Sequence, residues 1–256
     1  MYSKRTGAGT PLLVFVHGFG CSHEDWEAQR KALDGRHEVI ACDLPGHGLT
    51  RGEVTDAGIA NFGRQVAGLL ERPSVIIGHS MGCRIALQAA ALLPDRVAGI
   101  VLIDGSRIGQ GDPAVAQETV CQQIDAVGYP AFIDTFFLSM FVRPLPENEE
   151  LLARAKRVPT DFGRALFLDT VRWDAAELEG VLAKIRAPLL AIQSTAMNVE
   201  RKRVTMSKGD TSPWLELLKE RVHGTRVEII PGIGHFIQLE APEVVSRLVG
   251  AFAANL

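Results

Sequence analysis

Residues 74–82, which read Ser-Val-Ile-Ile-Gly-His-Ser-Met-Gly, restrict the fold of this chain more than any other stretch. Residues 75–77 are a short apolar run typical of a strand buried on both faces, and apolar residues recur at helical spacing directly after Gly82. Ser80 therefore lies at a turn from strand to helix. The pattern Gly-x-Ser-x-Gly at such a turn is typical of a nucleophile elbow.

The elbow gives the Ser80 hydroxyl a reactive setting. Gly78 and Gly82 carry no Cβ, so strand and helix can approach closely while the serine backbone is held in a strained conformation. The hydroxyl then projects from the carboxyl end of the sheet, at a helix N-terminus whose free N–H groups favour developing negative charge. We predict that Ser80 is a nucleophile; the alternative is a serine that only caps the helix.

The rest of the chain alternates between apolar runs and helical patterns, which predicts an α/β fold. We expect a doubly wound, mostly parallel sheet with right-handed crossovers and helices on both faces. The runs expected to be strands are 11–16, 39–42, 75–77, 97–103, 188–192 and 226–230.

The alternation stops between about residues 107 and 180, where aromatic residues gather without a convincing strand. We predict that residues 1–106 and 181–256 form the core and that residues 107–180 form a helical cap over the carboxyl end of the sheet. Aromatic residues such as Phe137 and Trp173 either line the space beneath this cap or pack the cap's own small core.

Composition argues against several classes of partner. The net charge of −3 offers no basic surface for nucleic acid, and the one basic cluster, residues 201–203, is short. The first apolar run, residues 12–16, is too short for a signal peptide or a membrane span, so we expect no membrane partner and a cytoplasmic location.

The cysteines and the overall composition give no sign of a metal or cofactor. No two cysteines form a Cys-x-x-Cys pair, and their spacing suggests neither a zinc site nor a disulfide framework. We expect reduced, structural thiols and no metal or cofactor. The four cysteines are Cys21, Cys42, Cys83 and Cys121.

His235 is the strongest candidate for a general base. It stands in Gly-Ile-Gly-His-Phe, residues 232–236, directly after the expected strand 226–230, where an imidazole can lie over the crevice at the strand ends. His47 is also flanked by glycines, in the loop 43–48, but a histidine in such a tight loop is more often a structural hydrogen-bonding group.

Four motifs, in this order and spacing, make the whole chain resemble the α/β-hydrolase superfamily. The resemblance implies that Ser80 is the nucleophile, that His235 is the base, and that the backbone N–H groups of Phe19 and Met81 form the oxyanion hole. A serine at the elbow argues against dehalogenases and epoxide hydrolases, which carry Asp there. The motifs are His-Gly-Phe-Gly at 17–20, Asp-Leu-Pro-Gly-His-Gly at 43–48, Gly-His-Ser-Met-Gly at 78–82 and Gly-Ile-Gly-His-Phe at 232–236.

The chain departs from the family pattern at the triad acid. Most members place an Asp just after the strand that follows the cap, where this chain reads Gln-Ser-Thr-Ala-Met-Asn at 193–198. Some members carry the acid one strand earlier, and Asp104 stands there, although Asp-Gly is also ordinary turn chemistry. We predict Asp104 as the acid, with Asp210 as the second candidate and Glu200 as the third.

The resemblance implies a serine hydrolase that cleaves a small ester, lactone or thioester through an acyl-enzyme, without a cofactor. The expected partner is a small-molecule acyl substrate. Hydrolysis of C–C or amide bonds with the same triad, and a weakly catalytic receptor-like member, remain alternatives. Arg84 could bind a substrate carboxylate, but a contact with a neighbouring helix or with solvent is favoured. The sequence leaves the oligomeric state open.

Overall fold

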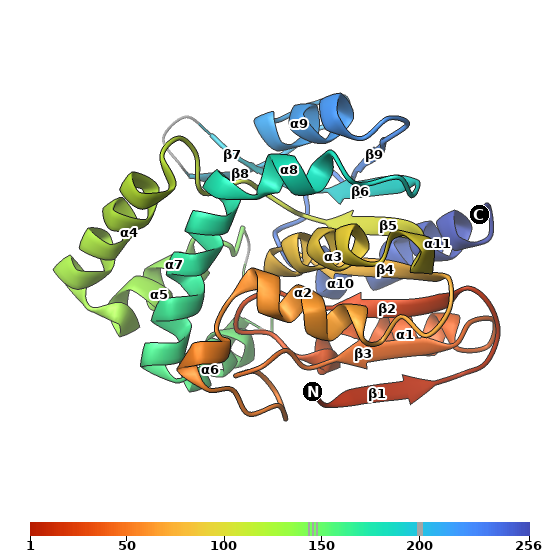
Figure 1. The fold of residues 1–256 in the computed structure, drawn as a ribbon, viewed down its shortest axis with the longest axis horizontal. Coiled ribbons are helices and arrows are strands. Elements are labelled where there is room, and N and C mark those ends of the chain that lie inside the picture. The colour runs from red at the N-terminus through yellow and green to blue at the C-terminus, as the bar shows by residue number, and fades with distance from the viewer. Residues whose placement is uncertain (143, 145, 147, 199–201) are drawn as a thin grey trace.

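A mostly parallel sheet of seven strands forms the centre of the computed structural model, which describes residues 1–142, 144, 146, 148–198 and 202–256 (Figure 1). The strand order is β1-β3-β2-β4-β5-β6-β9. All neighbours pair in parallel except β1, which is antiparallel to β3 at the edge. The strands are β1 (Ser3–Thr6), β2 (Leu12–Val16), β3 (Val39–Cys42), β4 (Ser74–His79), β5 (Val97–Ile103), β6 (Leu189–Gln193) and β9 (Arg226–Ile229).

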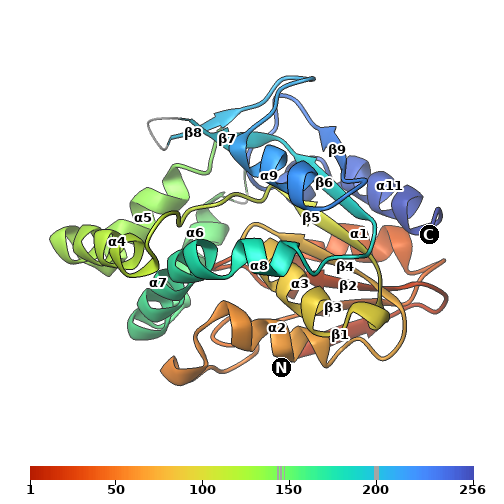
Figure 2. The same cartoon turned by 45° about the horizontal axis from the view of Figure 1, so that its top comes forward.

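Helices cover both faces of this sheet, so the predicted doubly wound architecture is confirmed (Figures 1 and 2). Alternate residues of each buried strand enter different cores: Leu13 and Phe15 pack toward α1 and α11, whereas Leu12 and Val14 pack toward the opposite face. One face carries α1 (Glu27–Leu33) and α11 (Pro242–Ala253); the other carries α2 (Ile59–Ala67), α3 (Met81–Leu92), α8 (Leu178–Leu182) and α9 (Pro213–Arg221). Shorter helical turns are η1 (His23–Trp26), η2 (Val54–Asp56), η3 (Pro94–Arg96) and α10 (Ile237–Glu240).

The segment between β5 and β6 is helical wherever it forms regular structure in the described residues. Its helices are α4 (Pro113–Val127), α5 (Tyr129–Leu138), α6 (Asn148–Arg157) and α7 (Thr160–Ala176), followed by α8. In Figure 1, α4 to α7 lie beyond the arrowheads of the parallel strands, at the carboxyl end of the sheet. The predicted boundary between residues 180 and 181 falls inside α8, which packs against α3, and the division into core and cap stays a prediction.

Three strands have no counterpart in the sequence prediction. Strand β1 reads Ser-Lys-Arg-Thr and lies at the sheet edge, so it has no apolar run to reveal it. The other two, β7 (Thr195–Met197) and β8 (Arg203–Thr205), form an antiparallel hairpin just after β6. They read Thr-Ala-Met and Arg-Val-Thr, which is too short to show a strand pattern in the sequence. The hairpin positions side chains of the site described below.

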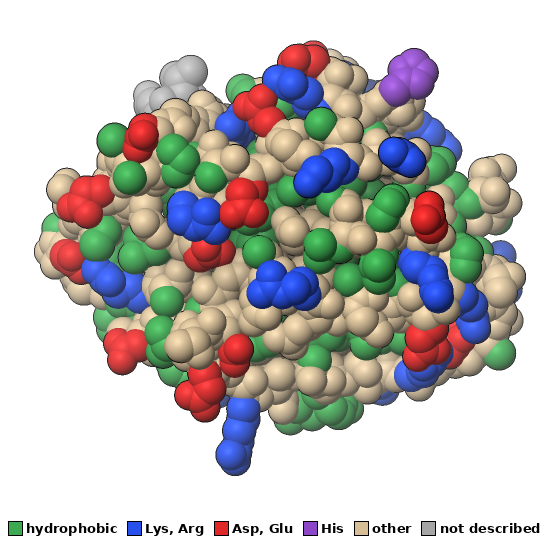
Figure 3. Space-filling view, viewed as in Figure 1, with side chains coloured by type: hydrophobic (Ala, Val, Ile, Leu, Met, Phe, Trp, Pro, Cys, Tyr) green, Lys and Arg blue, Asp and Glu red, His purple; other side chains and the backbone are tan. Residues whose placement is uncertain are grey.

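The surface in Figure 3 mixes acidic and basic side chains and shows no continuous basic stripe on this face. Within the described residues, no helix is long and apolar enough to cross a membrane. The expected absence of nucleic-acid and membrane partners stays a prediction.

Candidate active site

Ser80 stands between β4 and α3 in a conformation that non-glycine residues rarely adopt, with φ 53° and ψ −115°. Its two flanking glycines permit this turn, as the sequence predicts. A Cβ on Gly78 would lie 2.2 Å from the carbonyl oxygen of Gly82, and a Cβ on Gly82 would lie 2.3 Å from that of Val16. Both distances are too short for any side chain, so glycine is required at each position.

His235 connects Ser80 to Asp104. Its Nε2 lies 2.9 Å from Ser80 Oγ and its Nδ1 lies 2.7 Å from Asp104 Oδ2. The imidazole is buried in the loop after β9. With a proton on Nδ1, His235 donates to the Asp104 carboxylate, and Nε2 then accepts a hydrogen bond from the serine hydroxyl.

Asp104 follows β5 with a positive φ of 45° and is completely buried. Its Oδ1 accepts hydrogen bonds from the backbone N–H groups of Ser194 and Thr195, at 2.8 and 2.9 Å, and lies 3.2 Å from the Ser194 hydroxyl oxygen. Its Oδ2 accepts from the Thr195 hydroxyl and from Nη1 of Arg203 at 3.2 Å, in addition to His235. The segment that lacks the usual acid thus supplies donors to an acid on the neighbouring strand.

Burial and neighbouring charges set the protonation states of this pair. Burial raises the pKa of Asp104, but its hydrogen bond with His235 and the charges of His235 and Arg203 outweigh burial and hold the pKa at about 2. Burial lowers the pKa of His235 to about 4; the positive charge of Arg203 adds to this effect, and Asp104 opposes it. At neutral pH the aspartate is ionised and the imidazole is free to accept a proton.

Asp210, the second acid candidate, makes no hydrogen bond or ion pair with His235 among the described residues. Asp210 is exposed, and its Oδ2 accepts a hydrogen bond from the backbone N–H of Ser207 at 2.7 Å within its own turn. Glu200 lies outside the described residues. His47 is buried, and its Nδ1 donates to the Pro45 carbonyl at 2.9 Å, which is the structural role that its loop suggests.

The two predicted oxyanion-hole residues flank Ser80. Met81 begins α3, so its N–H has no partner within the helix. Phe19 lies in the loop after β2, and this loop lies against the elbow, because a Cβ on Gly18 would be 3.1 Å from Ser80 Cβ. Neither N–H donates a hydrogen bond to another residue in the described part of the chain.

A cavity of about 750 Å³ lies between helices α4, α5 and α7, the residues after Asp104, and α9. The ring of Phe167, in its wall, is 6.2 Å from the ring of Phe19, so the cavity adjoins the loop that carries the Phe19 N–H. Its apolar lining consists mainly of Val120, Phe132, Phe136, Phe167, Val171 and Trp214.

Neither of the two aromatic residues singled out from the sequence lines this cavity. Phe137 packs between Phe19 and Phe236, with both ring centroids 6.5 Å away. The indole N–H of Trp173 donates to the side chain of Gln88 on α3 at 3.1 Å. Trp173 therefore packs α7 against α3, so it neither lines the larger cavity nor packs a separate core within the cap.

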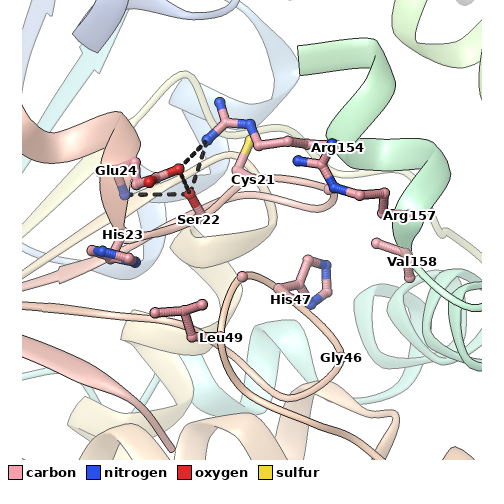
Figure 4. A pocket seen from close by; sticks show the side chains of 12 residues that line it. Cys21, Ser22, His23, Glu24, Gly46, His47, Leu49, Arg154, Arg157 and Val158 are labelled. Carbon is pink, nitrogen blue, oxygen red and sulfur yellow. Dashed lines mark hydrogen bonds and ion pairs between the residues drawn. The ribbon is translucent and has the colours of Figure 1, made fainter. Parts of the chain in front are cut away.

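A second cavity, of about 400 Å³, lies between residues 20–24, residues 46–49 and α6. Figure 4 shows Arg154 and Arg157 extending over it from α6. Arg154 donates to the Ser22 hydroxyl at 2.8 Å and forms an ion pair with Asp25. These contacts attach α6 to the loop that follows Phe19.

Arg84 is held by α7. Its guanidinium makes two 2.7 Å contacts with the Asp174 carboxylate and donates to the carbonyl of Ser106 at 2.6 Å. Both side chains are almost completely buried. Arg84 therefore contacts a neighbouring helix, the favoured alternative, and its charge is already paired.

The cysteines are all free, and three of them are buried. Burial raises the pKa of the Cys83 thiol to about 12, so this group beside the elbow is a neutral thiol at neutral pH. The described residues contain no group of three or more His, Cys, Asp or Glu side chains arranged to hold a metal ion.

Comparison with known proteins identifies the family. A sequence profile described as the alpha/beta hydrolase family matches residues 13–248. The chain belongs to the α/β-hydrolase family. This α/β-hydrolase is 27% identical to the pimeloyl-[acyl-carrier protein] methyl ester esterase of Methylococcus capsulatus, over all of this chain and 99% of the esterase.

Another relative is longer than this α/β-hydrolase. The acetyltransferase component of the acetoin cleaving system of Pseudomonas putida is 28% identical over 95% of this chain, which spans 63% of that relative's length. Among solved structures, the enol-lactonase of Burkholderia xenovorans superposes with a TM-score of 0.75 at 22% identity, covering 98% of this chain and 95% of the lactonase. A hydrolase from Oleispira antarctica gives 0.81 at 20% identity, covering 99% and 94%. These structural likenesses establish the fold.

Sequence reasoning did not find the groups that surround Asp104. In the sequence, Ser194 and Thr195 offer no carboxylate, and Arg203 stands in a short basic cluster. The signal was two hydroxyl side chains at the position where the family usually carries its acid. Hydrogen-bond donors at the usual position of the acid indicate that another part of the chain supplies the carboxylate.

Proposed function

We propose that this α/β-hydrolase is a serine hydrolase that cleaves a small carboxylic ester, lactone or thioester through an acyl-enzyme. The observation that carries the proposal is the continuous chain of hydrogen bonds from Ser80 through His235 to Asp104. An ionised acid, a neutral imidazole and a serine in this order are the arrangement that activates a serine hydroxyl.

In the proposed reaction, Ser80 Oγ attacks the substrate carbonyl carbon while its proton moves to His235 Nε2. The N–H groups of Phe19 and Met81 donate to the oxyanion that forms. The tetrahedral intermediate then breaks its bond to the leaving group, which takes the proton from Nε2. Asp104 remains ionised and holds the imidazolium in place.

A water molecule then repeats the sequence. His235 Nε2 takes a proton from the water as its oxygen attacks the acyl carbon, and the second tetrahedral intermediate forms in the same oxyanion hole. When the bond to Ser80 Oγ breaks, His235 returns the proton to the serine. The carboxylic acid leaves, and the enzyme is restored.

The substrate class follows from the surroundings of this site. The larger cavity is mostly apolar and adjoins the Phe19 loop, so we assign it to the acyl group, with helices α4, α5 and α7 acting as the cap. Its volume suits a small acyl compound rather than a polymer. The names of the relatives, which include a methyl ester esterase and an enol-lactonase, agree with ester and lactone substrates.

Covalent labelling tests the nucleophile. A fluorophosphonate probe should label the wild-type protein, because an activated serine attacks phosphorus as it attacks a carbonyl. Ser80→Ala should abolish labelling, whereas Ser106→Ala, a serine outside the hydrogen-bonded chain, should retain it. Labelling that persists in folded Ser80→Ala would refute the assignment of the nucleophile.

A substrate panel tests the bond that is cleaved. Short-chain aryl esters, lactones and thioesters should be hydrolysed by the wild-type protein and not by Ser80→Ala. Turnover confined to amides or β-diketones would show that the same triad cleaves another bond. Labelling without turnover of any panel member would favour a weakly catalytic, receptor-like protein.

A further inference from the structure

The guanidinium of Arg203 lies in the immediate surroundings of the proposed triad. Arg203 comes from β8, its side chain is only 7% exposed, and its Nη1 is 3.2 Å from Asp104 Oδ2. The same Nη1 donates to the Thr195 hydroxyl at 2.6 Å, and that hydroxyl in turn donates to Asp104 Oδ2. Arg203 therefore contacts the carboxylate both directly and through Thr195.

Arg203 and His235 share one carboxylate oxygen. His235 Nδ1 is 2.7 Å from Oδ2 and Arg203 Nη1 is 3.2 Å from it, so the two nitrogens lie within about 6 Å of each other. In a Ser-His-Asp triad, the negative charge of the aspartate normally acts wholly on the imidazolium that forms during the reaction. Here a permanent cation already balances that charge, because arginine does not lose its proton in proteins.

We propose that Arg203 is a positioning residue that balances the charge of Asp104 and thereby lets His235 act as a base in more acidic solution than an unbalanced Asp–His pair would allow. The inference rests on the proposed function. Arg203 and Thr195 both belong to the β7–β8 hairpin, so this hairpin sets the pH range over which His235 can act as a base. Thr195 holds the guanidinium beside Asp104 Oδ2.

Neither Arg84 nor His79 can balance the charge of Asp104 in place of Arg203. Arg84, on α3, is positively charged, but two contacts of 2.7 Å pair it with Asp174. His79, on β4, has its ring centroid 4.7 Å from that of His235, and burial lowers its pKa to about 3, so it is neutral at neutral pH. Asp104 and Arg203 are then the two charges that act most directly on the imidazole.

Removing the charge of Arg203 should make His235 more basic. The sign follows because a nearby cation disfavours the imidazolium, so its loss raises the pKa of His235. At about 6 Å and an effective dielectric constant of about 20, the shift is on the order of one to two pH units. Arg203→Met and Arg203→Gln should both show it, whereas Arg203→Lys should remain close to wild type.

Two measurements read this shift. The first is the pH dependence of kcat/KM, whose acidic limb should move to higher pH by on the order of one to two units in the Met and Gln variants. The second is an NMR titration of the His235 imidazole in the Ser80→Ala background, which needs no turnover. It therefore tests this inference even if the proposed hydrolase activity fails.

Matched variants separate charge from structure. Arg203→Gln keeps a polar side chain but no charge, so a Gln variant that titrates like wild type would overturn the proposal. It would also be overturned if Lys gives the same shift as Met. Arg172→Met removes an arginine of α7 that pairs with Asp169 and Glu177 and does not act on His235, so it should leave the titration of His235 unchanged.

Discussion

Replacing Asp104 by asparagine should abolish most turnover by reversing the His235 tautomer. Two backbone N–H groups donate to the Oδ1 position, so the amide oxygen will occupy it and the NH2 group will face His235. Nδ1 must then accept a hydrogen bond, which moves the imidazole proton to Nε2, beside Ser80. A protonated Nε2 cannot take the serine proton, and in triad chemistry this change costs about 10⁴ in turnover, or roughly 5.5 kcal/mol.

The same change should lower stability, because it leaves the buried Arg203 without its carboxylate. Breaking a buried ion pair from one side costs on the order of 3–5 kcal/mol, although the Thr195 hydroxyl still accepts from the guanidinium at 2.6 Å. Activity must therefore be measured well below the melting temperature of the variant, with circular dichroism to show that it is folded.

Asp210→Asn is the matched control. Its carboxylate accepts a hydrogen bond from Ser207 in an exposed turn, so kcat/KM should fall by less than about tenfold. Steady-state kinetics on an aryl ester will compare the two variants. If folded Asp104→Asn keeps activity within tenfold of wild type, or if Asp210→Asn shows the large loss, the assignment of the acid is wrong.

Two further predictions concern the cap and the pH dependence of stability. Phe136→Ala should shift acyl-chain preference toward longer esters because it enlarges the larger cavity. Trp173→Ala should lower the free energy of unfolding by roughly 3–5 kcal/mol and leave chain preference unchanged. Equal chain preference in Phe136→Ala and wild type would contradict the assignment of the acyl site. Four buried histidines have pKa values lowered by burial, so below about pH 6.5 the unfolded chain binds protons that the folded chain does not. Urea unfolding should show a loss of about 1 kcal/mol per pH unit for each of them, and constant stability from pH 7 to 5 would contradict the pKa shifts. They are His17, His47, His79 and His235.

Much of the sheet could be predicted from the sequence, because central strands are buried on both faces and are continuously apolar. Residues 12–16 and 97–103 are of this kind, and both are strands in the structure. Strand β1 and the hairpin β7–β8 could not be predicted in the same way. Strand β1 is polar, and β7 and β8 have only three residues each, so none of the three carries a periodic apolar signal.

The positions of the candidate site residues were accessible from sequence because parallel strands end at one edge of the sheet. Ser80, Asp104 and His235 each follow such a strand, so the topology alone brings them near one another. The lining of the larger cavity was not accessible. Helical spacing tells which residues share a face, but it does not tell whether that face meets a cavity, as for Phe136, or the core, as for Trp173.

The position of Asp104 explains why an acid one strand earlier can reach the same histidine. Strands β5 and β6 are parallel neighbours, with Ile103 beside Ile192, and the backbone N–H of Asp104 donates to the Ile192 carbonyl at 2.8 Å. The two strand ends are therefore adjacent. The Ser194 hydroxyl also donates to the carbonyl of Gly234 at 2.7 Å, so the turn after β6 contacts both the acid and the loop that carries His235. A carboxylate at the end of β6 would bring its own negative charge into this space, whereas hydroxyl and N–H groups there can hold the carboxylate from β5. Donor groups after β6, in place of the usual acid, therefore go together with a carboxylate after β5, because the donors hold that carboxylate.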